Sequence, residues 1–210
     1  MSVAHEYAIL GGINRARVGR YLAILAAGIS AASVLFSSSL AAVLQEKGLP
    51  REWFGWAASA LSASVTWAVL YWLLDNFAWQ WPVLGRALGV PNLRGRWRVS
   101  GETLNSSHEV TFQWQGTLTI TQRWDKIRVR LQTSQSSSIS ITAAILSEED
   151  DGWRLLYTYR NEPRIGESSL SSHRGSADIV FDSNLQSAVG EYFNGAGRFT
   201  FGRMDITRDT

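Results

Sequence analysis

Two long apolar stretches lie in the first half of the chain. Neither residues 21–44 nor residues 54–74 contain a charged side chain. An α-helix rises about 1.5 Å per residue, so each stretch is long enough to cross the ~30 Å hydrocarbon core of a bilayer. The pattern therefore predicts two transmembrane α-helices within an N-terminal segment that spans residues 1–91.

Two other interpretations fit an apolar N-terminal stretch. A cleaved signal peptide has an apolar run of roughly 7 to 15 residues, which residues 21–44 exceed. A pair of buried helices in a soluble bundle rarely lacks charge over such a length. Because the second stretch follows almost at once, we favour a membrane anchor.

Charged residues around the two stretches predict their orientation. The connection at 45–53 carries two basic and two acidic residues. Arginines lie outside the pair of stretches on both sides, at Arg15, Arg17, Arg20, Arg86, Arg94, Arg96 and Arg98. Basic residues tend to stay on the cytoplasmic side of a membrane. We therefore expect a multi-pass protein with two spans, whose N-terminus and C-terminal domain both face the cytoplasm.

Small residues recur at intervals of four in both stretches. The set comprises Ala27, Ala31, Gly55, Ser59 and Ala63. Such stripes let helices approach closely in lipid. The pattern leaves open whether they pack the two spans of one chain together or join helices of different subunits.

Beyond residue 92 the apolar pattern changes to a period of two. In residues 110–121, for example, apolar positions alternate with threonine and glutamine, which is typical of a half-buried strand. Eight strands are predicted, at 94–104, 110–121, 127–132, 138–147, 153–161, 176–182, 188–193 and 199–207. Closure would remove exposed sheet edges, so we expect residues 92–210 to form an all-β domain, an antiparallel up-and-down β-barrel of about eight strands. Its polar outer positions exclude a lipid-facing barrel.

The composition narrows the possible chemistry. The 210 residues include no cysteine and three histidines, and none of the histidines is paired at the spacing of a metal site. Residues 92–210 contain 14 basic and 14 acidic residues, whereas proteins that follow long nucleic acids carry a basic excess. The sequence has no Ser-His-Asp order and no phosphate-binding glycine loop. We expect no enzymatic activity, no metal, no cofactor and no long nucleic acid partner.

Aromatic and polar residues predict instead a site for a small ligand. Tyr157 and Tyr159 share one face of a strand and are followed by Arg160 and Asn161. Further candidates for the same end of a closed barrel are Trp97, Trp124, His173, Arg174 and Tyr192. Aromatic rings stack on nucleic acid bases, and arginine binds phosphate. Any one of these aromatic residues, taken alone, is more simply explained as part of the core.

A run of alternating serine and isoleucine residues adds a second polar feature. The hydroxyl groups of Ser136, Ser138 and Ser140 would share one face of their strand. They either make ordinary strand contacts or bind a polar ligand or a neighbouring protomer.

Several segments carry a family resemblance. Two closely spaced apolar stretches are followed by PNLRGRWRVSGE, which contains Gly95 and Trp97, and then by WQGTLTITQRWDKIRVRLQTSQSSSIS, LLYTYRNEP, HRGSADIVF and GEYFNGAGRFTFG. Together they resemble the two-transmembrane, β-strand-rich effectors of CBASS, the bacterial anti-phage systems that use cyclic oligonucleotide signals. The resemblance covers nearly the whole chain.

The resemblance implies a function for each part of the chain. A cytoplasmic minimal β-barrel would bind a cyclic dinucleotide made by a partner nucleotidyltransferase. Binding would drive formation of a homo-oligomer, whose membrane segments would disrupt the bacterial inner membrane and kill the infected cell. The candidate site residues within the matching segments are Tyr157, Tyr159, Arg160, Asn161, His173, Arg174 and Tyr192.

Two other functions remain compatible with the residues alone. The chain could be a membrane-tethered, lipocalin-like binder of a small apolar metabolite. It could also be a structural membrane-protein subunit whose barrel binds another protein. Neither alternative involves killing of the cell.

Overall fold

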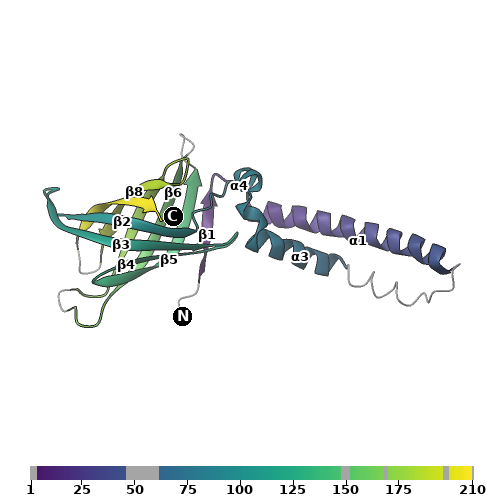
Figure 1. The fold of residues 1–210 in the computed structure, drawn as a ribbon, viewed down its shortest axis with the longest axis horizontal. Helices are drawn as coiled ribbons and strands as arrows, with labels where there is room; N and C mark the ends of the chain where they lie inside the picture. The colour runs from purple at the N-terminus through teal and green to yellow at the C-terminus, as the bar shows by residue number, and fades with distance from the viewer. Residues whose placement is uncertain (1–3, 46–61, 148–151, 168–169, 196–198, 210) are drawn as a thin grey trace. The chain divides into compact units, whose positions relative to one another are not determined.

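The computed structural model describes residues 4–45, 62–147, 152–167, 170–195 and 199–209, and its chain divides into two compact units (Figure 1). The unit Ile13–Trp79 is helical. The other unit combines Met1–Gly12 with Gln80–Thr210 and consists mainly of strands. Residues that precede the first helix therefore belong to the β unit, whereas the sequence pattern assigns them to the membrane segment.

The helical unit contains two long helices that pack on each other. Helix α1 (Arg15–Gln45) begins after Asn14, whose side-chain oxygen accepts a hydrogen bond from the Ala16 backbone N–H at 2.8 Å. Helix α3 (Ala63–Asn76) packs against α1, and the indole N–H of Trp67 donates to the Gly19 carbonyl at 3.4 Å. A short 3-10 helix, η1 (Ala78–Gln80), follows.

Within the described residues, one helix is long and apolar enough to cross a membrane. It is α1, over Arg15–Ser39, with a mean hydropathy of 1.8. Its Leu35 and Phe36 side chains are 69% and 70% exposed, so this chain does not bury them. The second predicted span falls partly outside the described residues, because the description resumes at residue 62. The second span and the orientation of the chain therefore stay predictions.

The small residues of the helical unit divide into buried and exposed positions. Ala26 and Thr66 are buried, at 1% and 8% exposure. Ala27, Ala31 and Ala63 are exposed, while Gly55 and Ser59 lie outside the described residues. Within the described residues these three members of the predicted stripe are exposed, and what the stripe packs against stays a prediction.

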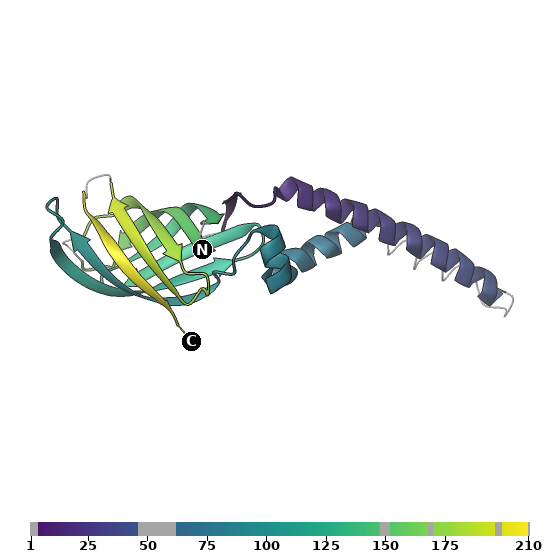
Figure 2. The same cartoon turned by 90° about the horizontal axis from the view of Figure 1, so that it is seen from above.

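Among its described residues, the β unit contains a short helix and a ring of nine strands. Helix α4 (Pro82–Leu88) ends at Gly89, which has a left-handed φ of 66°. The strands are β1 (His5–Leu10), β2 (Gly95–Leu104), β3 (Val110–Gln122), β4 (Lys126–Thr133), β5 (Ser136–Ser147), β6 (Trp153–Pro163), β7 (His173–Phe181), β8 (Ser187–Asn194) and β9 (Phe201–Arg208). They form a closed ring in the order β1-β4-β3-β2-β9-β8-β7-β6-β5, with a further pairing between β4 and β5 (Figure 2).

Strands β2 to β9 are the eight strands that the sequence pattern predicts. Each pairs antiparallel with its neighbour in the chain, and β2 pairs with β9 from Trp97↔Arg208 to Leu104↔Phe201. The prediction of about eight strands in a wholly antiparallel barrel is nevertheless incomplete. A ninth strand, β1, pairs antiparallel with β4 and parallel with β5. The sequence pattern misses β1 because it is short and its partners lie more than 100 residues away.

Strand β1 fills a gap between β4 and β5. These two strands pair only near their hairpin, from Arg130↔Ile139 to Gln132↔Ser137, and β5 has an irregularity after Ser140. The Ser140 hydroxyl oxygen accepts a hydrogen bond from the Val129 backbone N–H at 3.0 Å and lies 2.7 Å from Nε2 of His5. Side-chain bonds and β1 therefore replace the missing β4–β5 ladder.

The two ends of the ring differ in how they are filled. At the end that carries the β3–β4 and β7–β8 connections, called here the closed end, large side chains pack tightly. Trp97 and Phe181 meet edge to face, with ring centroids 5.0 Å apart, and the Arg208 guanidinium lies 4.8 Å from the Trp97 ring. Trp124 is 1% exposed. The opposite end, called the open end, carries the β2–β3, β4–β5, β6–β7 and β8–β9 connections.

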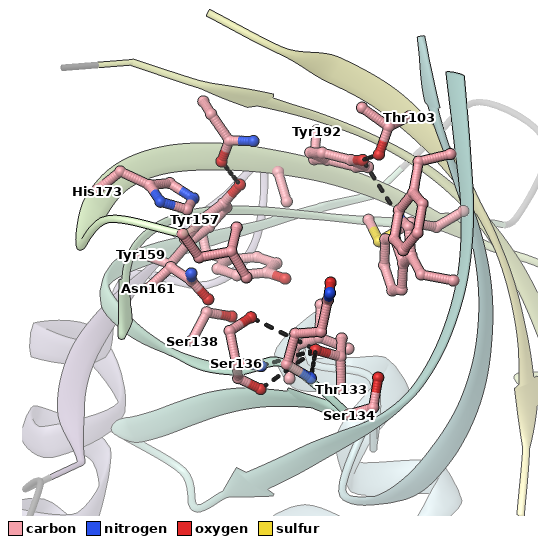
Figure 3. A pocket seen from close by; sticks show the side chains of 18 residues that line it. Thr103, Thr133, Ser134, Ser136, Ser138, Tyr157, Tyr159, Asn161, His173 and Tyr192 are labelled. Atoms are coloured by element: carbon pink, nitrogen blue, oxygen red, sulfur yellow. Dashed lines mark hydrogen bonds between the residues drawn. The ribbon is translucent and has the colours of Figure 1, made fainter. Parts of the chain in front are cut away.

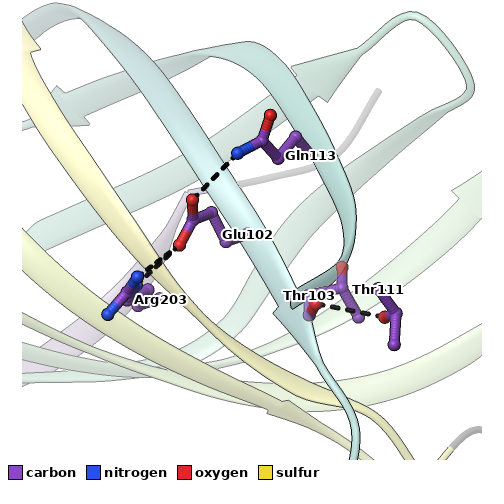
Figure 4. Close-up of polar contacts among 5 residues, drawn as sticks. All are labelled: Glu102, Thr103, Thr111, Gln113 and Arg203. Atoms are coloured by element: carbon purple, nitrogen blue, oxygen red, sulfur yellow. Dashed lines mark hydrogen bonds and ion pairs between the residues drawn. The ribbon is translucent and has the colours of Figure 1, made fainter. Parts of the chain in front are cut away.

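The outer face of the ring is polar, as the alternation predicts. Across β9, β2 and β3, Glu102 lies between Arg203, whose guanidinium nitrogens lie 2.7 Å from its carboxylate, and Gln113, whose amide donates at 3.0 Å (Figure 4). The hydrogen bond from Arg203, and then that from Gln113, lower the pKa of Glu102 below its usual value. Nearby, the Thr111 hydroxyl donates to the Thr103 carbonyl at 3.1 Å. This part of the outer surface is polar and hydrogen-bonded.

We predict that Tyr7→Ala loosens the ring where β1 fills the gap. Tyr7 is 2% exposed, and its hydroxyl donates to the Trp124 carbonyl at 3.0 Å. Truncating a large buried aromatic side chain costs about 3 to 5 kcal/mol of unfolding free energy. Hydrogen–deuterium exchange of the full chain in detergent should show faster exchange in β4 and β5. Leu10→Ala, at a 49% exposed position of the same strand, is the control, and equal exchange in the two variants would contradict the role of β1.

Candidate ligand pocket

A pocket opens inside the ring at its open end (Figure 3). Its water-accessible volume is about 100 Å³, smaller than the roughly 300 to 1,000 Å³ of typical small-ligand sites, so a larger ligand would also occupy the space at the open mouth. The lining residues are Thr103, Phe112, Trp114, Leu131, Thr133, Ser134, Gln135, Ser136, Ser138, Tyr157, Tyr159, Asn161, Leu170, His173, Ala177, Tyr192, Asn194 and Met204. They come from all eight strands β2–β9 and from the connections at this end.

Glycines in the strands leave room for the aromatic side chains that line the pocket. Gly101 is paired with Trp114, and a Cβ atom at Gly101 would collide with the Trp114 indole. Gly175 is paired with Tyr159, and a Cβ atom there would collide with the phenol ring. In both cases the ring lies flat over the glycine of the neighbouring strand. The interior therefore stays open at the centre instead of being filled by these rings.

Hydrogen bonds fix the orientation of the aromatic walls. The Tyr192 hydroxyl lies 2.7 Å from the Thr103 hydroxyl and accepts a bond from the Trp114 indole N–H at 3.3 Å. On the other side, the Tyr159 hydroxyl donates to the side-chain oxygen of Asn194 at 2.9 Å. Rings that are already held in place lose little conformational freedom when a ligand binds.

Several polar groups of the pocket are available to a ligand. The His173 ring donates from Nδ1 to the Ser171 carbonyl at 2.8 Å, and its Nε2 makes no hydrogen bond with the described residues. The Ser138 hydroxyl and the Asn161 side-chain amide likewise have no such partner among the described residues, although both residues are buried. None of these groups is among the fully buried side-chain atoms without a partner, so they stay open to water or to a polar ligand.

The pocket lining carries no Asp, Glu, Lys or Arg among the described residues. Its polar character comes from hydroxyl, amide and imidazole groups. Tyr157 illustrates this, because burial, together with a smaller effect of Tyr159, raises the pKa of its phenol above the ordinary value. Tyr157 is therefore a neutral hydroxyl group at physiological pH.

Five of the predicted site residues line this one pocket. They are Tyr157, Tyr159, Asn161, His173 and Tyr192. Ser136 and Ser138, from the predicted serine face, also line it, whereas Ser140 is engaged by His5 and Val129. The strand alternation places these side chains inside the ring, and the antiparallel order places them at the same end.

The other four predicted site residues do not reach the pocket. Trp97 and Trp124 belong to the packed closed end and are 0% and 1% exposed. Arg160 and Arg174 are paired across β6 and β7, and both are exposed on the outer face. Arg160 forms an ion pair with Glu162 at 3.0 Å. Arg160 and Arg174 lie on the face opposite the tyrosines because neighbouring residues of a strand point to opposite faces, whereas Trp97 and Trp124 are buried at the other end.

Sequence reasoning missed several residues that shape the pocket. Three of them lie where the ring closes by pairing of β2 with β9: Thr103 on β2, Trp114 on the adjacent β3, and Met204 on β9. Asn194 supplies the acceptor for the Tyr159 hydroxyl. The glycines at the aromatic pairs were a signal in the sequence, but they become readable only when the register between strands is known.

The comparisons with known proteins agree with this division of the chain. Residues 88–208 match the Cap15 cyclic dinucleotide receptor domain, and residues 16–80 match the Cap15 TM helices. CD-NTase-associated protein 15 of Yersinia aleksiciae is 42% identical to this chain over 205 residues, which cover 98% of this chain and 97% of the relative. This chain belongs to the Cap15 family. The resemblance to CBASS effectors is thereby confirmed.

Family membership gives the two units their general roles. The β unit corresponds to a cyclic dinucleotide receptor domain and the helical unit to the membrane region. The first description is that of a receptor domain, and the second is that of membrane helices. The pocket described above lies within residues 88–208, the part that matches the receptor family.

We predict that the buried phenol of Tyr157 makes the stability of the folded chain decrease at alkaline pH. Its pKa is raised in the folded chain, while an unfolded chain titrates at about 10. The stability contributed by the neutral phenol is therefore complete below about pH 10 and is lost as the pH rises toward the higher folded pKa. Thermal unfolding of the full chain in detergent should show that Tyr157→Phe is less sensitive to alkaline pH than the parent. Identical pH profiles would contradict the burial of this group.

Proposed function

We propose that this chain is a membrane-anchored CBASS effector whose pocket binds a cyclic dinucleotide, and that binding leads to oligomerisation and disruption of the bacterial inner membrane. The signal would come from a partner nucleotidyltransferase. The observation that carries the proposal is an aromatic-walled, uncharged pocket inside the domain that matches a cyclic dinucleotide receptor.

The chemistry of a cyclic dinucleotide suits this pocket. Its two bases offer flat faces, for which Tyr157, Tyr159 and Tyr192 provide aromatic partners. Stacking of this kind contributes about 1 to 3 kcal/mol per base. Its phosphates and sugar hydroxyls need hydrogen-bonding partners, which Ser138 and Asn161 can supply as buried groups. His173 Nε2 accepts a hydrogen bond when neutral and donates one when protonated.

We predict that Tyr159→Ala weakens ligand binding about ten- to a hundredfold, because it removes one stacking partner. Arg160→Ala is the matched control, since the next residue of the same strand points outward and should leave the affinity unchanged. Isothermal titration calorimetry of the full chain in detergent, with cyclic di-AMP, cyclic di-GMP and cyclic GMP–AMP as probes, measures both.

Two results would count against this pocket. Equal loss of affinity in both variants would place the ligand on the outer face. Unchanged affinity in both variants, measured on folded protein, would move the site away from β6 altogether. If no cyclic dinucleotide binds the parent but an apolar metabolite does, the lipocalin-like alternative gains support.

The membrane step of the proposal uses two spans with both termini in the cytoplasm. Two helices are too few to line a wide opening, so we infer that several chains must associate. Ala27, Ala31 and Ala63 support this, because they are exposed within the described residues. In lipid, such small residues permit close approach of helices from neighbouring subunits. A ligand that prefers the associated form would shift the population toward it.

We predict that the paired substitution Gly55→Leu with Ser59→Leu reduces membrane leakage while ligand binding is retained. The larger side chains would keep neighbouring helices apart without shortening the apolar stretch. Leakage of a small dye from cells that produce the cyclic dinucleotide, together with cross-linking of the full-length chain, measures the effect. If the variant inserts normally and leaks like the parent, the stripe is not an association surface. If the parent leaks fully as a ligand-bound monomer, the oligomer mechanism is wrong.

A further inference from the structure

The outer face of the ring mixes ion-paired charges, such as Arg98 with Asp209, with exposed charges that form no ion pair within the described residues. On β2 and β4, Arg96 and Arg130 occupy the same cross-strand row, with Thr119 of β3 between them. Both arginines are exposed, and neither forms an ion pair within the described residues. The next row, two residues along each strand, pairs Arg98 with Thr117 and Thr117 with Gln132. We call this surface of β2, β3 and β4 the basic face.

A second surface, on β8 and β9, carries acidic groups. Glu191 and Asp205 are exposed, and neither forms an ion pair within the described residues. Arg203, which is paired with Glu191 across the strands, directs its guanidinium to Glu102 instead. Val189 and Phe193, on either side of Glu191, are each 60% exposed. We call this surface of β8 and β9 the acidic face.

We propose that the basic face of one chain docks on the acidic face of a second copy, and that this contact builds the oligomer. The inference rests on the proposed function, which requires self-association. Because residues 92–210 contain equal numbers of acidic and basic residues, the charges on these two faces attract another copy of the same unit rather than a polyanion in general. When the basic face of one chain contacts the acidic face of another, the resulting dimer still has one free basic face and one free acidic face. Further copies can therefore add.

The shape of the basic face suits an inserted carboxylate. A groove on it is lined by Arg96, Thr117, Thr119, Gln132, Thr133 and Arg164. An acidic side chain such as Glu191 could bind arginine there, and threonine hydroxyls could serve as further donors. The exposed Val189 and Phe193 would add apolar contact beside it. The distances between the charges on the two faces are comparable. Arg96 and Arg130 are two inter-strand spacings apart, about 10 Å, and diagonal neighbours such as Glu191 and Asp205 lie about 7 to 8 Å apart.

The size of the faces explains why assembly would need a membrane. Three strands of about seven residues cover roughly 300 Å², whereas a standard interface buries about 800 Å² per partner. Such a contact is weak between molecules in solution. Anchoring in a membrane raises the effective concentration of the copies, so a weak contact can then build an assembly.

The groove and the ligand pocket share a structural element. Thr133, at the end of β4, lines both. Its carbonyl accepts a hydrogen bond from the Arg164 guanidinium at 3.0 Å on the groove side, and its hydroxyl accepts bonds from the backbone N–H groups of Gln135 and Ser136 in the β4–β5 turn. A ligand that contacts this turn from inside the ring would therefore act on the groove outside it.

A charge-exchange experiment tests the contact. Variant P carries Arg96→Glu with Arg130→Glu, and variant Q carries Glu191→Lys with Asp205→Lys. Each full-length chain is placed in vesicles of pure phosphatidylcholine, which have no net charge, with a mixture of cyclic di-AMP, cyclic di-GMP and cyclic GMP–AMP. Cross-linked oligomers are then quantified. We expect P alone and Q alone to form at least tenfold fewer oligomers than the parent, because like faces repel.

Mixing the variants supplies the matched control. In an equal mixture, every face of P meets an oppositely charged face of Q, so alternating oligomers should return to at least half of the parental amount. The chain with all four substitutions should assemble by itself. Assembly of the parent should fall at 1 M salt, where the Debye length is about 3 Å. None of the four residues lines the pocket, so calorimetry on monomeric chains in dilute detergent should show parental ligand affinity in every variant.

Each contrary outcome identifies a different failure. If P and Q each assemble like the parent, the two faces are not the interface, while the proposed function stands. If only P fails, and the parent assembles only after phosphatidylglycerol is added to the vesicles, the basic face binds anionic lipid and the self-contact is overturned. If the parent binds a ligand but never assembles, the oligomer step of the proposed function fails instead.

Discussion

Closure of the ring through β2 and β9 is the constraint on which the rest of the structure depends. The two strands are about a hundred residues apart, yet they pair over eight consecutive positions from Trp97↔Arg208 to Leu104↔Phe201. Once this ladder forms, every inward side chain of eight strands faces one enclosed volume, and every outward side chain faces water. The pocket and the charged faces are both consequences of that division.

Residue size along the inner face then decides which end becomes a site. At the closed end, Trp97 and Phe181 meet across the interior, and little space remains. At the open end, Gly101 and Gly175 let aromatic rings lie against the wall, and serine and threonine replace larger side chains. A protein interior is normally packed to the density of an organic crystal. A volume left open at one end, with aligned polar groups, is therefore a feature of this sequence rather than slack in its packing.

The N-terminal strand adds a connection between the two functions of the chain. β1 pairs with β5 and ends at Leu10, and α1 begins at Arg15. Ser140, which is held by His5 and by Val129, lies on the same strand as the pocket residues Ser136 and Ser138. The strand that borders the ligand space is thus hydrogen-bonded to the segment that leads directly into the apolar helix.

The sequence by itself determined the local features of this protein, because they depend on periods of a few residues. Uncharged length marks α1, and strict alternation marks β2 to β9 to within a few residues at each end. Alternation also decides which residues share a face, so Tyr157, Tyr159 and Asn161 could be grouped correctly. The same rule should have separated Arg160 from them.

Only the tertiary structure decided which faces meet. Strand β1 could not be predicted because its partner strands are distant in the sequence. Trp97 lies at the closed end and Tyr192 at the open end because of the register between strands across the ring. Equal numbers of acidic and basic residues say nothing of their placement, which depends on which strands become neighbours in the closed ring, where β2 pairs with β9 and β3 with β4. Local propensity acts over neighbours in the chain, whereas a site and a surface are made by residues that become neighbours only through closure.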